Sequence, residues 1–284
     1  MVSLNLNASA EKFIAGKWIA GYYLKDAVDR TAFLNSKGIG TSINFLGEDL
    51  SDRYKIKETM RTYTQLIKEI KRKKLKAQIS LKPTQIGLSI SYGEMRRNYL
   101  ELVRLARENG VFVWLDMESP KCVSDTIRVY KSALRYGNTG ICIQSYLKRS
   151  ESDIKELIKR KAKIRLVKGA YKIKDDGIFD SRKAATHNYM LLMDMLFKHS
   201  NEFMIATHDI RIIERAIKLN KRYKRKMDFA MLNGIRNGYA RYLANQGQKV
   251  YIYLPFGSDW IKFAYRRMIE QRHAYLILMS LFER

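Results

Sequence analysis

The chain has 284 residues, of which 46% are hydrophobic and 11% aromatic, with only 3 prolines and 16 glycines. This composition excludes a disordered chain and a fibrous repeat. Lys and Arg number 54 against 28 Asp and Glu, and the formal net charge of +26 favours an anionic partner: a nucleic acid, an acidic membrane surface or a small carboxylate.

The first segment, residues 1–36, is expected to be helical and to precede the main fold. Its start lacks the basic residues and apolar run of a secretory signal, and no uncharged stretch in the chain approaches the roughly 20 residues of a membrane span. An amphipathic helix is predicted over Lys25–Leu34, packed outside the main fold or across one end of it. We therefore expect a cytoplasmic protein whose membrane contact, where it has one, is peripheral.

Short apolar runs rich in β-forming residues recur after this helix, and eight strands are predicted from them. The runs are too apolar for half-exposed strands, so both faces must be covered. Cys142 falls inside one run, where it is expected to act as a small apolar side chain, and the cysteines do not indicate a disulfide framework. The predicted strands are Ile39–Leu46, Ala77–Lys82, Val111–Met117, Gly140–Tyr146, Ile164–Gly169, Phe203–Thr207, Met227–Leu232 and Val250–Leu254.

A segment with helical spacing follows each strand, and alternation of this kind predicts a parallel sheet with right-handed crossovers. Eight repeats favour closure into a (β/α)8 barrel over residues 37–271, with residues 272–284 as a tail and the whole chain as one domain. A nicotinamide-binding fold is disfavoured because no G-x-G-x-x-G follows the first strand. The predicted helices are Asp52–Arg72, Tyr92–Arg107, Val123–Leu134, Glu151–Lys159, Arg182–Phe197, Ile210–Tyr223, Asn237–Asn245 and Asp259–Gln271.

Three basic runs, Lys71–Lys74, Lys159–Lys163 and Lys221–Lys226, fall where a helix ends and the next strand begins. In a barrel this is the face opposite the active site. The favoured interpretation is a solvated rim that complements the helix dipoles, and docking to acidic lipid or nucleic acid is the alternative.

Polar side chains gather at the opposite, carboxyl ends of the predicted strands, where barrel enzymes carry their active sites. This many hydrogen-bonding groups around one mouth predicts a site for a charged ligand. No histidine cluster has the spacing of a zinc site, so no metal is expected. The residues are Glu48, Lys82, Asp116, Gln144, Arg165, Lys168, Thr207, His208 and Tyr253.

The helix predicted after the last strand carries two adjacent arginines, Arg266 and Arg267, with Glu270 one turn beyond Arg266. Paired guanidinium groups suit bidentate binding of a carboxylate, although an ordinary surface ion pair would give the same pattern.

Several of these segments resemble the proline dehydrogenase family, which includes the dehydrogenase domain of bifunctional proline utilisation proteins. The matches run in the family's order from about Phe13 to Glu270. They are Phe45–Glu48, Ser80–Lys82 with Thr84–Gly87, Leu115–Glu118, Ile143–Tyr146, Ile164–Tyr171, Ala206–His208, Tyr253–Gly257 and Arg266-Arg267-x-x-Glu270.

This resemblance implies an enzyme that oxidises L-proline to Δ1-pyrroline-5-carboxylate, the first step of proline degradation, with FAD as cofactor and a quinone as electron acceptor. It implies catalytic roles for Asp116 and Arg165, the latter donating towards flavin N5. Substrate contacts are implied for Lys82, Ala170, Tyr171, Leu232, Tyr253, Arg266 and Arg267. Cofactor contacts are implied for Met117, Gln144, Arg165, Val167, Lys168, Gly169, Lys183, Thr207, His208 and Glu270.

These roles agree with the chemistry, because a flavin accepting a hydride gains negative charge near N5 and its pyrimidine edge, where Arg165 and Gln144 could donate hydrogen bonds. The residues do not identify the base for the proline ammonium. Two alternatives stay open. One is the same barrel acting on hydroxyproline or another cyclic imino acid, which Tyr253 disfavours. The other is a basic nucleic-acid-binding barrel, which lacks the expected motifs.

Overall fold

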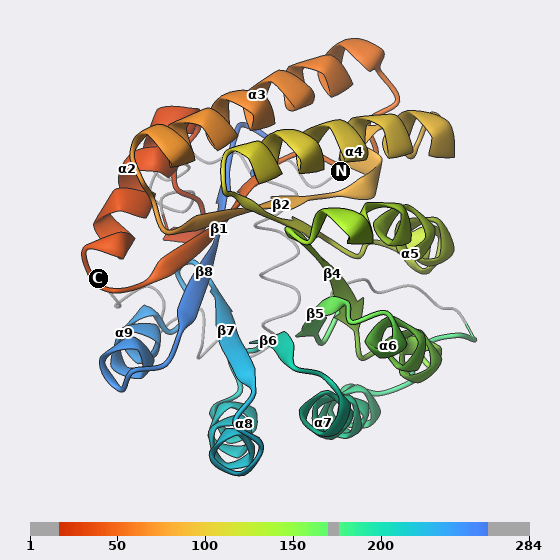
Figure 1. The fold of residues 1–284 in the computed structure, drawn as a ribbon, viewed down its shortest axis with the longest axis vertical. Coiled ribbons are helices and arrows are strands. Elements are labelled where there is room, and N and C mark those ends of the chain that lie inside the picture. Colours follow the sequence, from red (N-terminus) through yellow and green to blue (C-terminus); the bar gives the residue numbers. More distant parts are fainter. Residues whose placement is uncertain (1–16, 170–175, 261–284) are drawn as a thin grey trace, which may run out of the picture.

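The computed structural model describes residues 17–169 and 176–260, and in them eight parallel strands close into a barrel. The strands pair in chain order, and the first pairs with the last. Helices alternate with the strands and form an outer ring around them (Figure 1). The (β/α)8 prediction is confirmed.

The strands are β1 (Gly40–Phe45), β2 (Ala77–Leu81), β3 (Phe112–Leu115), β4 (Thr139–Gln144), β5 (Lys163–Val167), β6 (Glu202–Ala206), β7 (Lys226–Leu232) and β8 (Val250–Phe256). The α-helices are α2 (Leu24–Asn35), α3 (Arg53–Arg72), α4 (Tyr92–Glu108), α5 (Val123–Ala133), α6 (Ser150–Lys159), α7 (Arg182–His199), α8 (Ile210–Tyr223) and α9 (Asn237–Asn245). Short 3-10 turns are η1 (Pro83–Ile86), η2 (Pro120–Cys122) and η3 (Leu134–Tyr136).

Most predicted element boundaries agree with these bounds within about two residues, and β8 is the strand that extends further than predicted at its end. The predicted strand stops at Leu254, before Pro255, which has no N–H to donate to a sheet. In the structure β8 continues to Phe256 and Pro255 pairs with Asn44 of β1. The proline carbonyl still accepts a hydrogen bond, from Ala20 N at 2.8 Å. The helix predicted over residues 259–271 lies almost wholly outside the described residues.

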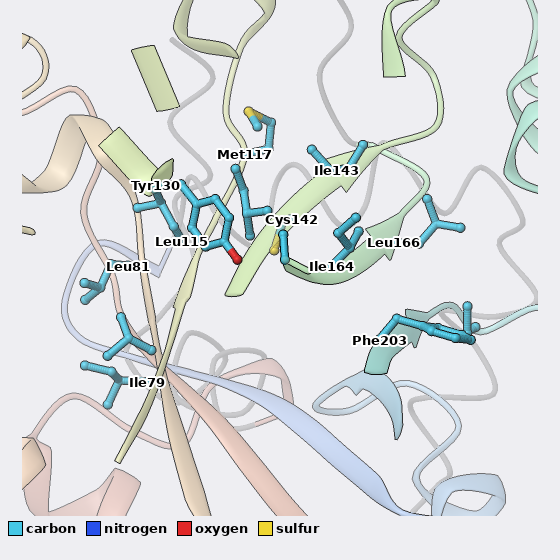
Figure 2. Packing of buried hydrophobic residues seen from close by; sticks show 14 of the residues in the cluster. Ile79, Leu81, Leu115, Met117, Tyr130, Cys142, Ile143, Ile164, Leu166 and Phe203 are labelled. Carbon is cyan, nitrogen blue, oxygen red and sulfur yellow. The ribbon is translucent and has the colours of Figure 1, made fainter. Parts of the chain in front are cut away.

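The main hydrophobic core lies between the strands and the surrounding helices. Outward-facing strand residues such as Ile79, Leu81 and Leu166 are fully buried and pack against helix residues such as Tyr130 (Figure 2). Each such burial is worth about 1.5–3 kcal/mol for a side chain of this size. This core fixes which strand residues must point inward, into the barrel.

A second, smaller cluster fills the inside of the barrel with Trp114, Met204, Ala230 and Tyr251. Two glycines make room for its rings: a Cβ on Gly140 would lie 2.4 Å from the Trp114 ring, and one on Gly40 would lie 2.5 Å from the Tyr251 ring. These side chains fill the interior of the barrel. The polar residues nearer the carboxyl ends of the strands form the next layer, closer to the mouth.

Helix α2 packs against β1, β8 and α3 on the outside of the barrel, while the segment before it reaches the mouth. Here Ala20 N donates to Pro255 O, and Gly257 N donates to Gly21 O at 3.0 Å. Both partners lie at the carboxyl end of β8. Of the two placements that the sequence left open for the helix, the structure shows the one outside the barrel.

The three basic runs lie where the sequence predicts them. They start in the last turns of α3, α6 and α8 and run towards β2, β5 and β7, on the face opposite the mouth. Lys71, Lys159 and Lys221 are among the exposed residues there. No helix in residues 17–169 and 176–260 combines the length and apolar character needed to span a bilayer.

Candidate active site

A buried ion pair between Asp116 and Arg165 lies at the centre of the mouth. Arg165 Nη2 contacts Asp116 Oδ1, and the two side chains are only 13% and 3% exposed for the aspartate and the arginine. Arg165 is in β5 and Asp116 directly follows β3. Because side chains of a strand alternate between its two faces, Arg165 points into the barrel between the outward-facing Ile164 and Leu166.

Three further side chains complete this network. Ser80 Oγ donates to Asp116 Oδ1 at 2.9 Å and accepts from Arg165 Nη2 at 2.7 Å. Tyr253 OH donates to Asp116 Oδ2 at 2.9 Å. Cys142 Sγ lies 2.8 Å from Arg165 Nε and 3.2 Å from Asp116 Oδ1. Five strands therefore contribute to one hydrogen-bonded layer, which sits on the Trp114 ring, 4.9 Å from the Arg165 guanidinium.

The protonation states in this layer follow from burial and from the two charges. Burial alone lowers the pKa of Arg165, but the interactions with Cys142 and Asp116 outweigh it and the net pKa is raised, so the guanidinium stays charged. Burial and then the Asp116 charge hold the pKa of Tyr253 well above its usual value. Tyr253 is therefore a hydrogen-bond donor at neutral pH, and it cannot serve as a base there.

Lys82 stands one layer above this network. It follows β2 two residues after Ser80, on the same face of the strand. Its Nζ lies 3.4 Å from Glu48 Oε2, and the two side chains are 11% and 14% exposed. A largely buried ammonium at the rim of the mouth is a suitable partner for an anionic group of a ligand.

Two polar atoms beside the ion pair have no hydrogen-bond partner within the described part of the chain: Arg165 Nη1 and Gln144 Oε1. The sequence-based expectation was that Gln144 donates to the flavin. In the structure its amide nitrogen uses one of its two N–H groups to donate to Met117 O at 3.1 Å, and its Oε1 is the atom without a partner. A buried donor or acceptor of this kind is costly unless a ligand pairs with it.

The backbone after β5 comes close to the ring of Tyr146. Gly169 has a φ of +105°, and a Cβ there would lie 2.0 Å from Tyr146 Cδ1. Only glycine fits this position. The absence of a side chain is what lets the Tyr146 ring pack directly against this backbone.

The rim after β5 and β6 is cationic. The pKa of half-buried Lys168 is lowered by burial and then by the neighbouring charge of Arg182, with Arg211 adding to the effect and Asp209 opposing it. Asp209 accepts from Arg211 N at 3.1 Å as the N-cap of α8. Cations beside a helix N-terminus suit the phosphates of a nucleotide.

His208 and Thr207 are held by the chain around them. His208 Nε2 accepts from Leu232 N at 2.8 Å, so in the neutral ring the proton is on Nδ1. Thr207 Oγ1 accepts from Asp209 N at 3.1 Å. Lys183 is exposed in the first turn of α7. The predicted residues Ala170, Tyr171, Arg266, Arg267 and Glu270 lie outside the described residues.

Sequence reasoning missed two kinds of site residue. Ser80 and Cys142 contact the ion pair directly, and each precedes a predicted site residue, Lys82 or Gln144, by two positions. The strand period of two could have found them. Trp18 could not be found in this way. It packs with Leu46 and Trp260 beside Tyr253, through a chain segment far away in sequence.

Comparison with known proteins agrees with this geometry. The family model described as proline dehydrogenase matches residues 27–275. The chain belongs to the proline dehydrogenase family. The predicted family and enzyme class are confirmed. Among the residues 17–169 and 176–260, no three His, Cys, Asp or Glu side chains are grouped closely enough to hold a metal ion.

Two relatives of this proline dehydrogenase family member illustrate the match. Proline dehydrogenase 2 of Bacillus subtilis is 30% identical over 261 residues, which cover 90% of this chain and 86% of the relative. Proline dehydrogenase of Deinococcus radiodurans is 30% identical over 278 residues, covering 94% and 90%.

The fold also matches a solved structure. Proline utilization A from Bdellovibrio bacteriovorus, inactivated by N-propargylglycine, superposes with a TM-score of 0.86 at 20% identity over 95% of this chain. The chain spans about a third of that protein, 34% of its length. At this identity the likeness supports the barrel alone.

Proposed function

We propose that the protein oxidises L-proline to Δ1-pyrroline-5-carboxylate with FAD as its cofactor. The observation that carries the proposal is the buried Asp116–Arg165 pair with Lys82 one layer above it, in a barrel of this family. The network gives a fixed, charged floor for a small zwitterion, and the rim supplies a cation for its carboxylate.

Proline would bind with its carboxylate near Lys82, assisted by Arg266 and Arg267. The hydroxyl of Tyr253 is fixed by Asp116 at 2.9 Å, so its ring can serve as a rigid wall for the pyrrolidine, with Leu232 on the neighbouring strand. Ala170 and Tyr171 complete the proposed set of substrate contacts. Such rigid walls contribute to rate by holding the reacting carbon in place.

The residues present fit a flavin. The unpartnered donor Arg165 Nη1 and acceptor Gln144 Oε1 match a ring that offers both acceptors and an N–H. The chemistry that FAD supplies in this reaction is acceptance of a hydride from C5 of proline. The residues proposed to hold it are Met117, Gln144, Arg165, Val167, Lys168, Gly169, Lys183, Thr207, His208 and Glu270.

Anaerobic spectroscopy tests the proposal. Purified protein, reconstituted with FAD where needed, should show the visible absorption of a flavin, and L-proline should bleach it. Δ1-pyrroline-5-carboxylate should form in equal amount. A protein that stays colourless and inert after reconstitution would refute the proposal.

Hydroxyproline is the nearest alternative substrate. Tyr253 stands where a ring hydroxyl would come, and the tyrosine cannot easily move because Asp116 holds its hydroxyl. We therefore expect kcat/KM for L-proline to exceed that for trans-4-hydroxy-L-proline by at least about tenfold, the effect of roughly 1.4 kcal/mol. Equal values would show that Tyr253 does not set this preference.

We propose a quinone as the electron acceptor and acidic lipid as a partner of the basic face. Each Lys or Arg near an acidic membrane contributes about 1 kcal/mol. The two proposals are tested separately, docking with vesicles that contain or lack an anionic lipid and the acceptor with a soluble quinone analogue. Sedimentation with acidic vesicles would support docking, and reduction of a soluble quinone analogue would support the acceptor. Because the basic face is opposite the mouth, docking through it would be no support for quinone reduction.

A further inference from the structure

Glu118 has no role in the site described above. It is a buried carboxyl group that is hydrogen-bonded to the loop after β2. It follows β3 by three residues and is 3% exposed. Its Oε2 accepts from Thr84 N at 2.8 Å, and its Oε1 accepts from Thr84 Oγ1 at 2.7 Å. Both oxygens therefore engage one residue of the turn η1, which begins directly after Lys82.

Thr84 is also hydrogen-bonded to the loop after β1. Asp49 N donates to Thr84 Oγ1 at 2.8 Å, and Leu50 N donates to Thr84 O at 3.2 Å. The loops after β1, β2 and β3 are therefore joined at one threonine. Glu118 is the group that anchors it from the third strand.

The ion pair of Lys82 with Glu48 lies between these restraints. Lys82 is the N-cap of η1, and Glu48 precedes Asp49, so each member of the pair lies within two residues of a Thr84 contact. Building on the proposed proline site, we propose that Glu118 is a positioning residue. It fixes η1 through Thr84 and so aims Lys82 at the substrate carboxylate.

The restraint needs the ionised form of Glu118. Thr84 donates two hydrogen bonds to it while its hydroxyl oxygen also accepts from Asp49, and a protonated carboxyl would leave one donor without an acceptor. Burial raises the pKa of Glu118 to about 7, with Lys82 and Thr84 opposing the rise and Asp49 adding to it. Cys122, which also lies near Glu118, has a pKa raised by burial and stays neutral in this range.

The test is the affinity for tetrahydrofuran-2-carboxylate, a proline analogue whose ring oxygen cannot titrate, measured by calorimetry between pH 6 and pH 8. In the wild type the Kd should rise as the pH falls through about 7. Glu118→Gln should bind roughly tenfold more weakly at pH 8, about the effect of losing one charge-assisted hydrogen bond, and its Kd should not change with pH. KM for L-proline should rise by a similar factor, while kcat changes less than about twofold.

Matched variants separate positioning from folding. Thr84→Val should reproduce the rise in Kd, Thr84→Ser should restore wild-type binding, and the surface change Glu69→Gln should have no effect. Because Thr84→Val leaves Glu118 in place, it tests the inference even if Glu118→Gln does not fold. Wild-type Kd in folded Glu118→Gln or Thr84→Val would overturn the inference and leave proline oxidation standing. A wild type that binds neither analogue nor proline would overturn both.

Discussion

At the scale of single residues, the Asp116–Arg165 pair should be the most sensitive point of the molecule. Asp116→Asn leaves a buried guanidinium without its counter-charge, which costs about 3–5 kcal/mol of stability. Proline oxidation should also be lost in any protein that still folds. Denaturant unfolding and steady-state kinetics would measure the two effects.

The control for this change is a carboxylate that pairs at the surface. Glu156 binds Lys131 and Arg160, and its side chain is 45% exposed. Glu156→Gln should therefore cost less than about 1 kcal/mol. Equal losses in the two variants would mean that the central pair is no more important than a surface contact.

The raised pKa of Glu118 predicts a specific pH dependence of stability. Its pKa is about 7 in the fold against an ordinary value of 4.5, so the folded state keeps a proton that the unfolded state releases. The stability it contributes is present below about pH 4.5 and is lost as the pH rises to about 7, by about 3 kcal/mol in all.

Comparing Glu118→Gln with the wild type isolates this group. The free energy of unfolding of the variant, relative to wild type, should rise between pH 5 and pH 8. A constant difference would contradict the assigned pKa. The ionised form proposed to aim Lys82 is thus the less stable form of the fold.

Much of the central network could be anticipated from the sequence, because strand ends and strand periodicity locate it. Asp116, Arg165, Lys82 and Tyr253 all follow from that pattern, and the structure brings Asp116, Arg165 and Tyr253 into contact. The role of Glu118 could not be read, because it depends on a contact between loops. The contacts proposed for Arg266 and Arg267 stay predictions.

At the scale of elements, hydrophobic periodicity was sufficient to place the strands and helices, because each strand is covered on both faces. It could not foresee that β8 continues through Pro255, whose carbonyl accepts from Ala20 N in a segment far away in sequence. Nor could it place residues 17–21 at the mouth. Both features depend on a contact between the two ends of the described chain.

The turn after β5 offers a test at this scale. Gly169→Ala would put a methyl group 2.0 Å from the Tyr146 ring at a φ of +105°. The ring would have to move, and the free energy of unfolding should fall by more than about 2 kcal/mol. Flavin retention should fall as well. Thermal unfolding and the bound flavin per chain measure these effects.

Gly247→Ala is the matched control for this turn. Gly247 ends α9 with a φ of +76°, and a Cβ there would meet nothing within 4 Å. Only the backbone conformation is penalised, so the cost should be about 1 kcal/mol and flavin retention should not change. Equal costs at the two glycines would mean that Tyr146 moves aside freely.

At the scale of the whole molecule, the charge is divided between two faces with different tasks. The mouth pairs its buried cations with Glu48 and Asp116, whereas the opposite face gathers the basic runs after α3, α6 and α8. The total of +26 therefore describes mainly the outer surface. It explains why composition alone left a nucleic acid, an acidic membrane surface and a small carboxylate open as partners, while the site favours a small zwitterion.

This excess charge predicts that salt stabilises the fold. The Debye length falls from about 30 Å at 0.01 M to about 8 Å at 0.15 M salt, so added NaCl screens the repulsion among cations more than it weakens the few surface ion pairs. The Tm should therefore rise over that range. Replacing Lys71 and Lys159, both exposed on the basic face, by Gln should raise the Tm at low salt and reduce its dependence on salt. A Tm that falls with NaCl would mean that attractive pairs, rather than the net repulsion, dominate the electrostatics of this barrel.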